Sequence, residues 1–203
     1  MRSAPLRVIR LAGMTAPVLL LAGCVSFGAK PPPSLLVLTP TAAAPAGTID
    51  HGAARSSVVL DDFDAPQKLD VLRVPVQIDA SSIAYLKDAQ WVDKPARLLR
   101  NLIGETIRAK DGVLVVDGDG PGALNATHLT GTLRDFGYDA ASSSVVAVLD
   151  VTRAGATASD PVTTRRFEAR VPGVEAKAGP VGIALDQAAN QIAGQVADWV
   201  KPG

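Results

Sequence analysis

Few residues of this 203-residue chain are of a type that could carry out chemistry, and their spacing does not assemble a recognisable catalytic site. The two histidines, His51 and His128, have no serine in a Gly-x-Ser-x-Gly motif to activate. The acidic run at 117–122 resembles a calcium loop, but no carboxylate follows it before Arg134 to act as the closing bidentate ligand. We therefore expect no enzyme activity, no metal site and no cofactor.

The single cysteine, Cys24, is the residue whose surroundings indicate a definite reaction. It follows a segment typical of an export signal, with a basic start and an apolar stretch about half as long as a membrane-spanning helix. The run Leu21-Ala22-Gly23-Cys24 resembles the bacterial lipobox. That resemblance implies cleavage between Gly23 and Cys24 and acylation of the cysteine by fatty acids such as palmitate. The alternative is an ordinary secreted protein with an incidental cysteine.

Acylation of Cys24 would hold the protein on a membrane without a spanning helix. Two or three acyl chains, each contributing about 0.8 kcal/mol per buried CH₂, anchor a protein almost permanently. An aspartate after the cysteine resembles an inner-membrane retention signal, and this chain has Val25 and Ser26 there. We therefore expect a location in the cell envelope, on the periplasmic face of the outer membrane.

Length and composition indicate one folded domain. Hydrophobic residues make up 47% of the chain and charged residues 20%, which provides enough apolar material for a core and excludes a disordered chain. Removal of residues 1–23 takes away three of the 20 basic residues and none of the 20 acidic ones, so the mature chain has a net charge of −3. Its longest basic run is Arg165-Arg166, so we expect no nucleic-acid binding.

The predicted organisation has three parts: a signal peptide at 1–23, a Pro-rich tether at 24–34 and a folded domain at 35–203. Three successive prolines favour polyproline II, which at about 3.1 Å per residue gives the tether a reach of about 30 Å. The tether is either an arm that holds the domain away from the lipid or a plain leader with no required length.

Hydrophobic patterns predict the elements of the domain. Short apolar or alternating runs predict strands at 35–38, 58–60, 69–78, 82–86, 113–116, 129–138, 145–151 and 166–171, the last three as an antiparallel meander. The alternation changes phase between Leu133 and Phe136, which indicates a bulge near Arg134-Asp135.

Two longer segments have helical spacing. The first begins at Pro95 and the second runs from about Pro180 to Val200. The predicted fold class is α+β, a mostly antiparallel sheet with two main helices packed against it, preceded by a lipoprotein signal and a Pro-rich tether.

The chain resembles the ABC-type transport auxiliary lipoprotein component family, the lipoproteins of paraquat-inducible-type intermembrane transport systems. The resemblance covers most of residues 35–200. It is carried by Ser82-Ile83-Ala84-Tyr85, by Trp91-Val92-Asp93-Lys94-Pro95-Ala96-Arg97-Leu98-Leu99, by Leu129-Thr130-Gly131-Thr132-Leu133 with the strand pair through Phe167, and by Gln187-Ala188-Ala189.

The resemblance implies a non-catalytic periplasmic subunit that works with an ABC permease, its ATPase and a mammalian-cell-entry (MCE) domain protein in intermembrane lipid transport. The cargo would be phospholipid or another hydrophobic solute. The energy would come from the ATPase, and this chain has no Gly-x-x-x-x-Gly-Lys-Ser/Thr phosphate loop. A homo-oligomer around an MCE assembly is compatible with this role.

Two other classes of function stay open. One is a structural or assembly lipoprotein of the envelope, of the lipopolysaccharide-assembly or secretion-pilot type. The other is a tethered hydrolase.

Four residues near the start of the first helix are candidates for a partner surface. Tyr85 and Trp91 could form an exposed aromatic anchor, although aromatic residues of this kind more often pack in the core. Arg97 and Arg100 could meet a partner's carboxylates or lipid phosphates, and a solvated helix face is the alternative.

Overall fold

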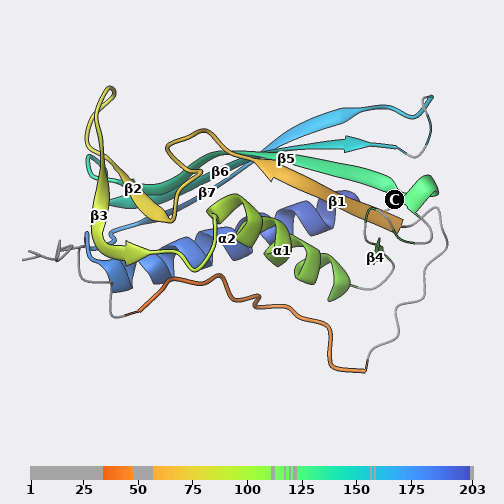
Figure 1. Ribbon diagram of the computed structural model, residues 1–203, viewed down its shortest axis with the longest axis horizontal. Coiled ribbons are helices and arrows are strands. Elements are labelled where there is room, and N and C mark those ends of the chain that lie inside the picture. Colours follow the sequence, from red (N-terminus) through yellow and green to blue (C-terminus); the bar gives the residue numbers. More distant parts are fainter. Residues whose placement is uncertain are drawn as a thin grey trace, which may run out of the picture. The chain divides into compact units, whose positions relative to one another are not determined.

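The computed structural model describes residues 34–47, 57–110, 113–116, 118, 120, 123–155, 157 and 159–201. The predicted signal peptide, Cys24 and the tether up to residue 33 lie outside the described residues, as do His51 and Asp117. The elements in chain order are β1 (Ser57–Asp64), β2 (Arg73–Gln77), β3 (Ile83–Gln90), α1 (Pro95–Arg108), β4 (Leu114–Val116), the 3-10 helix η2 (Ala123–Asn125), β5 (Thr127–Asp139), β6 (Ser144–Ala154), β7 (Thr163–Pro172) and α2 (Ala178–Val200) (Figure 1).

The longest strand, β5, organises the sheet. One edge of β5 pairs with β6, and β6 pairs with β7, both in antiparallel register. The other edge of β5 is shared by two parallel strands, β1 next to its first half and β2 next to its last residues. Strand β4 continues the sheet beyond β1, and β3 continues it beyond β2.

The prediction of a mostly antiparallel sheet is corrected to a mixed sheet. The pairings β1–β4, β1–β5 and β2–β5 are parallel. Parallel neighbours need a long crossover connection, and the chain supplies one between β1 and β4 that contains β2, β3 and α1. The antiparallel meander of β5, β6 and β7 is confirmed, and so is its bulge, because the register shifts between Leu133 and Asp135.

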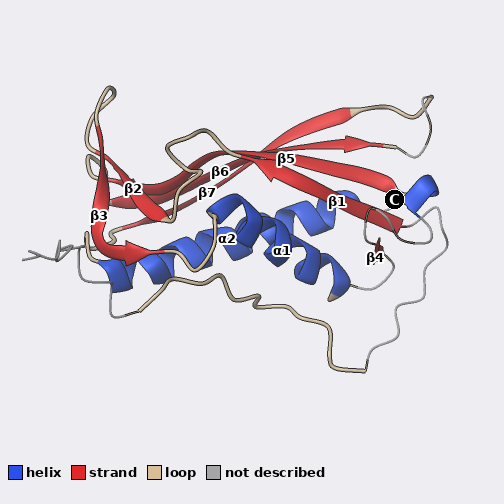
Figure 2. Cartoon of the chain, viewed as in Figure 1, coloured by secondary structure: helices blue, strands red, loops and turns tan. Residues whose placement is uncertain are grey.

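Both helices lie on the same face of the sheet (Figures 1 and 2). Helix α2 packs on β6 and β7, and α1 packs on β1 and on α2. The buried face of α2 is rich in alanine, which lets the helix approach the strands closely. The largest fully buried side chains lie between these layers: Trp91, Phe136, Phe167, Leu69, Leu99, Ile103, Ile107, Leu129, Leu133, Leu149, Leu185 and Ile192.

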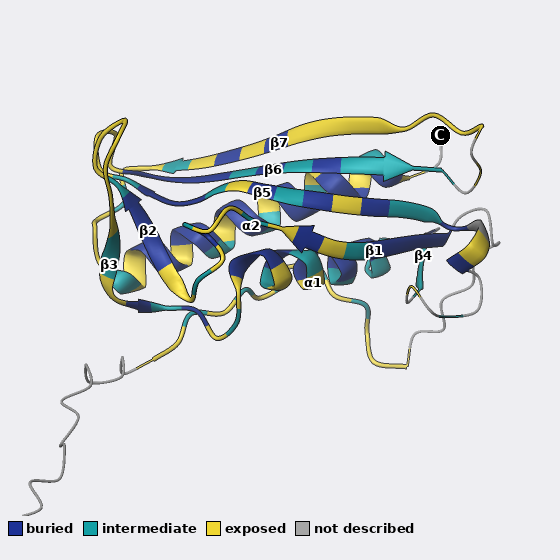
Figure 3. Cartoon of the chain, turned by 45° about the horizontal axis from the view of Figure 1, so that its top comes forward, coloured by how far each residue is buried: buried dark blue, intermediate teal, exposed yellow. Residues whose placement is uncertain are grey.

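In the described part of the chain, no helix lies over β6 and β7 on the opposite face of the sheet (Figure 3). Figure 3 shows β7 largely exposed along its length, with buried positions alternating among the exposed ones. This alternation is the signature of an antiparallel strand with one packed face and one solvated face.

The first described segment is an extended stretch, residues 34–41, that we call the strap. It runs along the helical side of the molecule (Figure 1, orange). The strand predicted at 35–38 is corrected to a single parallel bridge between Leu36 and Trp91. The strap does not form a full strand because its later residues bond to α2 rather than to the sheet.

Candidate functional site

Trp91 is the point where the strap, the sheet and the first helix meet. Its ring is fully buried and stacks on Phe136 with 5.4 Å between ring centroids. Its backbone N–H donates to the carbonyl of Leu72 at 2.7 Å, and its bridge to Leu36 brings in the strap. The prediction of Trp91 on a partner surface is therefore corrected: the side chain is a core residue, as its large apolar area favours.

Two backbone hydrogen bonds attach the strap to the end of β3. The N–H of Leu36 donates to the carbonyl of Gln90 at 2.7 Å, and the N–H of Val92 donates to the carbonyl of Leu36 at 3.0 Å. The edge of the sheet is thus lengthened by one short parallel segment at the position where the domain begins.

Side chains of α2 hold the rest of the strap. The N–H of Thr39 donates to Asp186 Oδ1 at 2.7 Å. The carboxamide of Asn190 accepts from the N–H of Thr41 and donates to the carbonyl of Thr39, both at 2.9 Å. The Asn190 side chain therefore supplies hydrogen-bond partners for the N–H and C=O groups of the strap, as a neighbouring strand would.

A close approach of Leu36 to Gly182 completes this contact. A Cβ atom placed on Gly182 would lie 2.6 Å from Leu36 Cδ2, which is closer than real carbon contacts allow. Gly182, Asp186 and Asn190 are spaced four residues apart, so they form one stripe along α2. This stripe is the docking site for the strap.

The Arg100 side chain forms hydrogen bonds within the domain. Its guanidinium donates to the backbone carbonyl of Leu60 at 2.6 Å and to that of Asp61 at 3.0 Å. Those carbonyls lie beyond the β1–β4 pairing, which ends at Val59, so Arg100 supplies donors where the ladder stops. The prediction of Arg100 as a partner-facing residue is corrected, because its Nε and Nη2 groups donate to the backbone of β1.

Arg97 and Tyr85 are the remaining candidates. Arg97 is exposed and forms an ion pair with Asp93 at 3.1 Å across one helical turn. Tyr85 is half-buried, with Arg73 stacked 3.8 Å above its ring centroid. The structure thus leaves Arg97 accessible and Tyr85 in part, but it does not bring the four predicted residues together on one surface.

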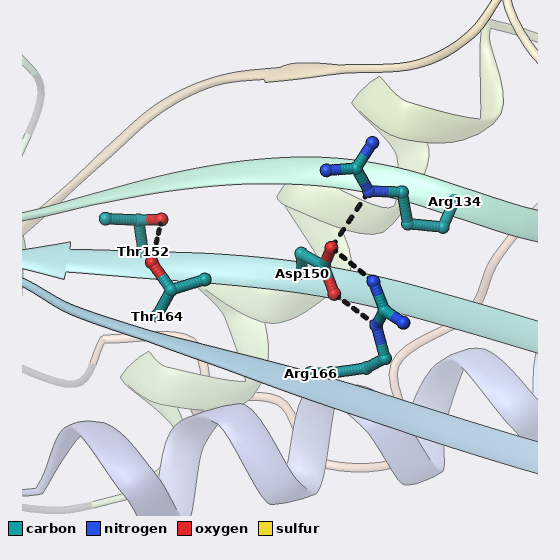
Figure 4. A network of polar contacts seen from close by, with 5 residues as sticks. All are labelled: Arg134, Asp150, Thr152, Thr164 and Arg166. Atoms are coloured by element: carbon teal, nitrogen blue, oxygen red, sulfur yellow. Dashed lines mark hydrogen bonds and ion pairs between the residues drawn. The ribbon is translucent and has the colours of Figure 1, made fainter.

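The helix-free face of the sheet carries a polar network that sequence reasoning missed (Figure 4). Asp150 on β6 accepts from Arg134 at 2.9 Å and from Arg166 at 2.6 Å, and these arginines come from the strands on either side. The Arg166 hydrogen bond is the main cause of the lowered pKa of Asp150, which falls from 3.8 to about 2. The alternation of residues along β6 could have placed Asp150 outward, but only the strand register brings the arginines to it.

We also searched the described residues for metal-binding clusters, pockets and membrane-spanning helices. Among the residues that the structure describes, no group of histidine, cysteine and acidic side chains could hold a metal ion. A small pocket where β2 meets β5, next to Lys68 and Gln77, holds about 10 Å³, which is the space of one water molecule. No helix in the described part of the chain is both long enough and apolar enough to cross a bilayer.

The fold has counterparts among solved structures. A Xanthomonas campestris protein of the DUF330 family is 15% identical, with a TM-score of 0.64 over 82% of this chain and 94% of that chain. A second structure, of an uncharacterised protein, is also 15% identical, with a TM-score of 0.63 over 72% of this chain and 93% of that one. At this identity the two structures define the class of fold.

A more distant structure is the PelC dodecamer of Paraburkholderia phytofirmans, at 11% identity, with a TM-score of 0.39 over 72% of this chain and 93% of that chain. Its similarity is too low to support an argument. Among curated proteins, none matches this chain significantly in sequence.

The family follows from the sequence together with this fold. The family model of the ABC-type transport auxiliary lipoprotein component matches residues 37–197. The chain therefore belongs to that family. The match spans the elements from the strap to the last turns of α2.

Proposed function

We propose that the protein is a non-catalytic accessory lipoprotein of an ABC transport system, held on the periplasmic face of the outer membrane by acylated Cys24. The observation that carries the proposal is the family match over residues 37–197. In this role it works with a permease, its ATPase and an MCE-domain protein to move phospholipid or another hydrophobic solute between membranes.

The strap supports an anchored role. It is the first described segment after the predicted anchor, and it is fixed to both β3 and α2. A chain end held by both the sheet and a helix does not fray, so an anchor that precedes it is joined to a folded part of the domain.

The proposal is tested by purifying the full-length protein, tagged at its C-terminus, from detergent-solubilised membranes. We expect the permease, the ATPase and an MCE-domain protein to be enriched over a purification of an unrelated outer-membrane lipoprotein. The matched control is Cys24→Ser, which lies outside the folded domain and removes the acylation site. This variant is expected to lose the lipid anchor and, with it, most of the partners.

Two results would contradict the proposal. Enrichment of lipopolysaccharide-assembly or secretion proteins in place of transporter subunits would favour the assembly-lipoprotein alternative. A preparation without any transporter subunit, from cells that express one, would remove the basis for a transport role.

A further inference from the structure

Exposed aliphatic side chains gather around the strap contact. In the described part of the chain, nine large apolar side chains are exposed, at Leu35, Val37, Leu72, Ile78, Ile83, Val92, Leu124, Val162 and Ile183. Four of them adjoin the Leu36–Trp91 bridge or the Leu36–Gly182 contact. These four, Leu35, Val37, Val92 and Ile183, are 49%, 53%, 50% and 74% exposed, and we call them the strap patch.

The backbone geometry explains why these side chains point outward. Leu36 turns toward the core beside Trp91, so its neighbours Leu35 and Val37 turn the other way. Val92 follows Trp91 in the same way and therefore shares the outward side with Val37. Ile183 follows Gly182 on α2 and is rotated about 100° around the helix, away from the sheet.

The polar groups beside the strap patch are paired. Asp93, the residue after Val92, forms an ion pair with Arg97, and Lys94 forms one with Asp70 at 2.8 Å. Asp186 accepts the N–H of Thr39. A surface that approached the patch would therefore meet aliphatic groups bordered by two ion pairs and one hydrogen-bonded carboxylate, and partners already made within the domain lower the cost of desolvation.

We propose that the strap patch rests on the lipid surface in which the acylated Cys24 is anchored; the inference depends on the anchor of the proposed function. The choice of a lipid surface follows from the chain length: only nine residues lie between Cys24 and Ser34, and the reach from one to the other is about 30 Å. Such a short link holds the patch at a high effective concentration next to the bilayer, where aliphatic side chains enter the headgroup boundary. The tether then acts as a leader and not as an arm that keeps the domain away.

The experiment places a nitroxide spin label at Val37→Cys in the full-length protein, reconstituted in phosphatidylethanolamine–phosphatidylglycerol vesicles. Acylated Cys24 has no thiol, so the label reacts at the introduced cysteine. The matched control is Val162→Cys, an exposed valine in the β6–β7 connection. This connection lies at the opposite end of the folded domain from the start of the strap (Figures 1 and 3). The readout is relaxation of each label by oxygen, which enters lipid, and by a nickel chelate, which does not.

We expect the label at 37 to be reached by the nickel chelate about tenfold less than the label at 162, because a polar complex is excluded from acyl chains. Oxygen should relax the label at 37 strongly. Equal access of nickel to both positions, in protein that floats with the vesicles, would overturn the inference and leave the anchor intact. A label at 37 shielded from both reagents would also overturn it, since that result indicates a protein partner or a second copy. Protein that does not float with the vesicles would contradict the anchor itself.

Discussion

Leu36 and Gly182 interlock: the leucine side chain occupies the space that any side chain at position 182 would need. This contact joins the first described residues of the domain to α2, the longest of the described helices. It is reinforced one and two turns further along α2 by Asp186 and Asn190. The strap is thus an integral part of the fold, and weakening its contacts with α2 should be measurable.

Replacing Gly182 by alanine should loosen the strap. The new methyl group would displace Leu36, and we expect hydrogen exchange at the Leu36 and Thr39 amides to rise about tenfold, equivalent to about 1.4 kcal/mol. The matched control is Gly194→Ala on the same helix, where a Cβ meets open space. That variant should leave strap exchange unchanged and stabilise the protein by about 0.5–1 kcal/mol. Equal exchange in both variants would contradict the interlock.

Asp150 should make stability dependent on acid pH. Its pKa is about 2 in the folded protein and 3.8 as the ordinary value, so its contribution is fully present above about pH 4 and is lost as the pH falls toward 2. Both arginine partners are more than half exposed, which reduces the contribution through solvent screening. Asp150→Asn should therefore lower the free energy of unfolding by about 1 kcal/mol at pH 7. Urea titrations of both proteins at pH 7 and pH 2.5 check this, and a loss of the same size at both pH values would argue against the ion pairs as its source.

Trp91 should tolerate phenylalanine much better than alanine. Its buried Nε1 has no hydrogen-bond partner among the described residues, so the indole N–H is a cost to the folded state. Trp91→Phe keeps the stack on Phe136 and should change stability by less than about 1.5 kcal/mol, whereas Trp91→Ala should lose about 3–5 kcal/mol. Thermal denaturation followed by circular dichroism measures both. Similar losses for the two variants would indicate that the indole N–H is used.

Arg100 and Arg97 lie one helical turn apart but should respond differently to substitution. Arg100→Ala removes charged donors from the carbonyls of Leu60 and Asp61 and should cost about 2 kcal/mol. Arg97→Ala breaks one exposed ion pair and should cost less than about 1 kcal/mol. Chemical denaturation of both variants tests the assignment. A larger loss for Arg97 would show that the roles are reversed.

The sequence predicted the elements better than their arrangement. The bulge in β5 was readable because the phase of apolar alternation changes there, and both helices were readable from their spacing. The parallel pairing of β5 with β1 and β2 could not be predicted, because strands joined by a long crossover show no local sequence pattern that identifies them as neighbours. The prediction of a full strand at 35–38 was wrong because four successive apolar residues indicate an extended backbone but do not show which segment it pairs with.

The predicted partner surface also depended on tertiary contacts that the sequence does not show. Trp91 stands between a strand and a helix, where neither periodicity assigns it a side, and its burial depends on tertiary neighbours such as Phe136. The sequence pattern does not distinguish Arg100 from Arg97, because both are predicted on the polar side of the same helix. Only the tertiary structure shows that β1 lies next to Arg100. The Arg134–Asp150–Arg166 network likewise needed the register of three strands.

Mass spectrometry of the native protein purified from membranes tests the lipid anchor directly. We predict a chain that begins at Cys24 and carries two or three fatty acyl chains on that residue. An unmodified thiol at Cys24, or a chain that retains residues 1–23, would contradict the lipid anchor on which the proposed function rests.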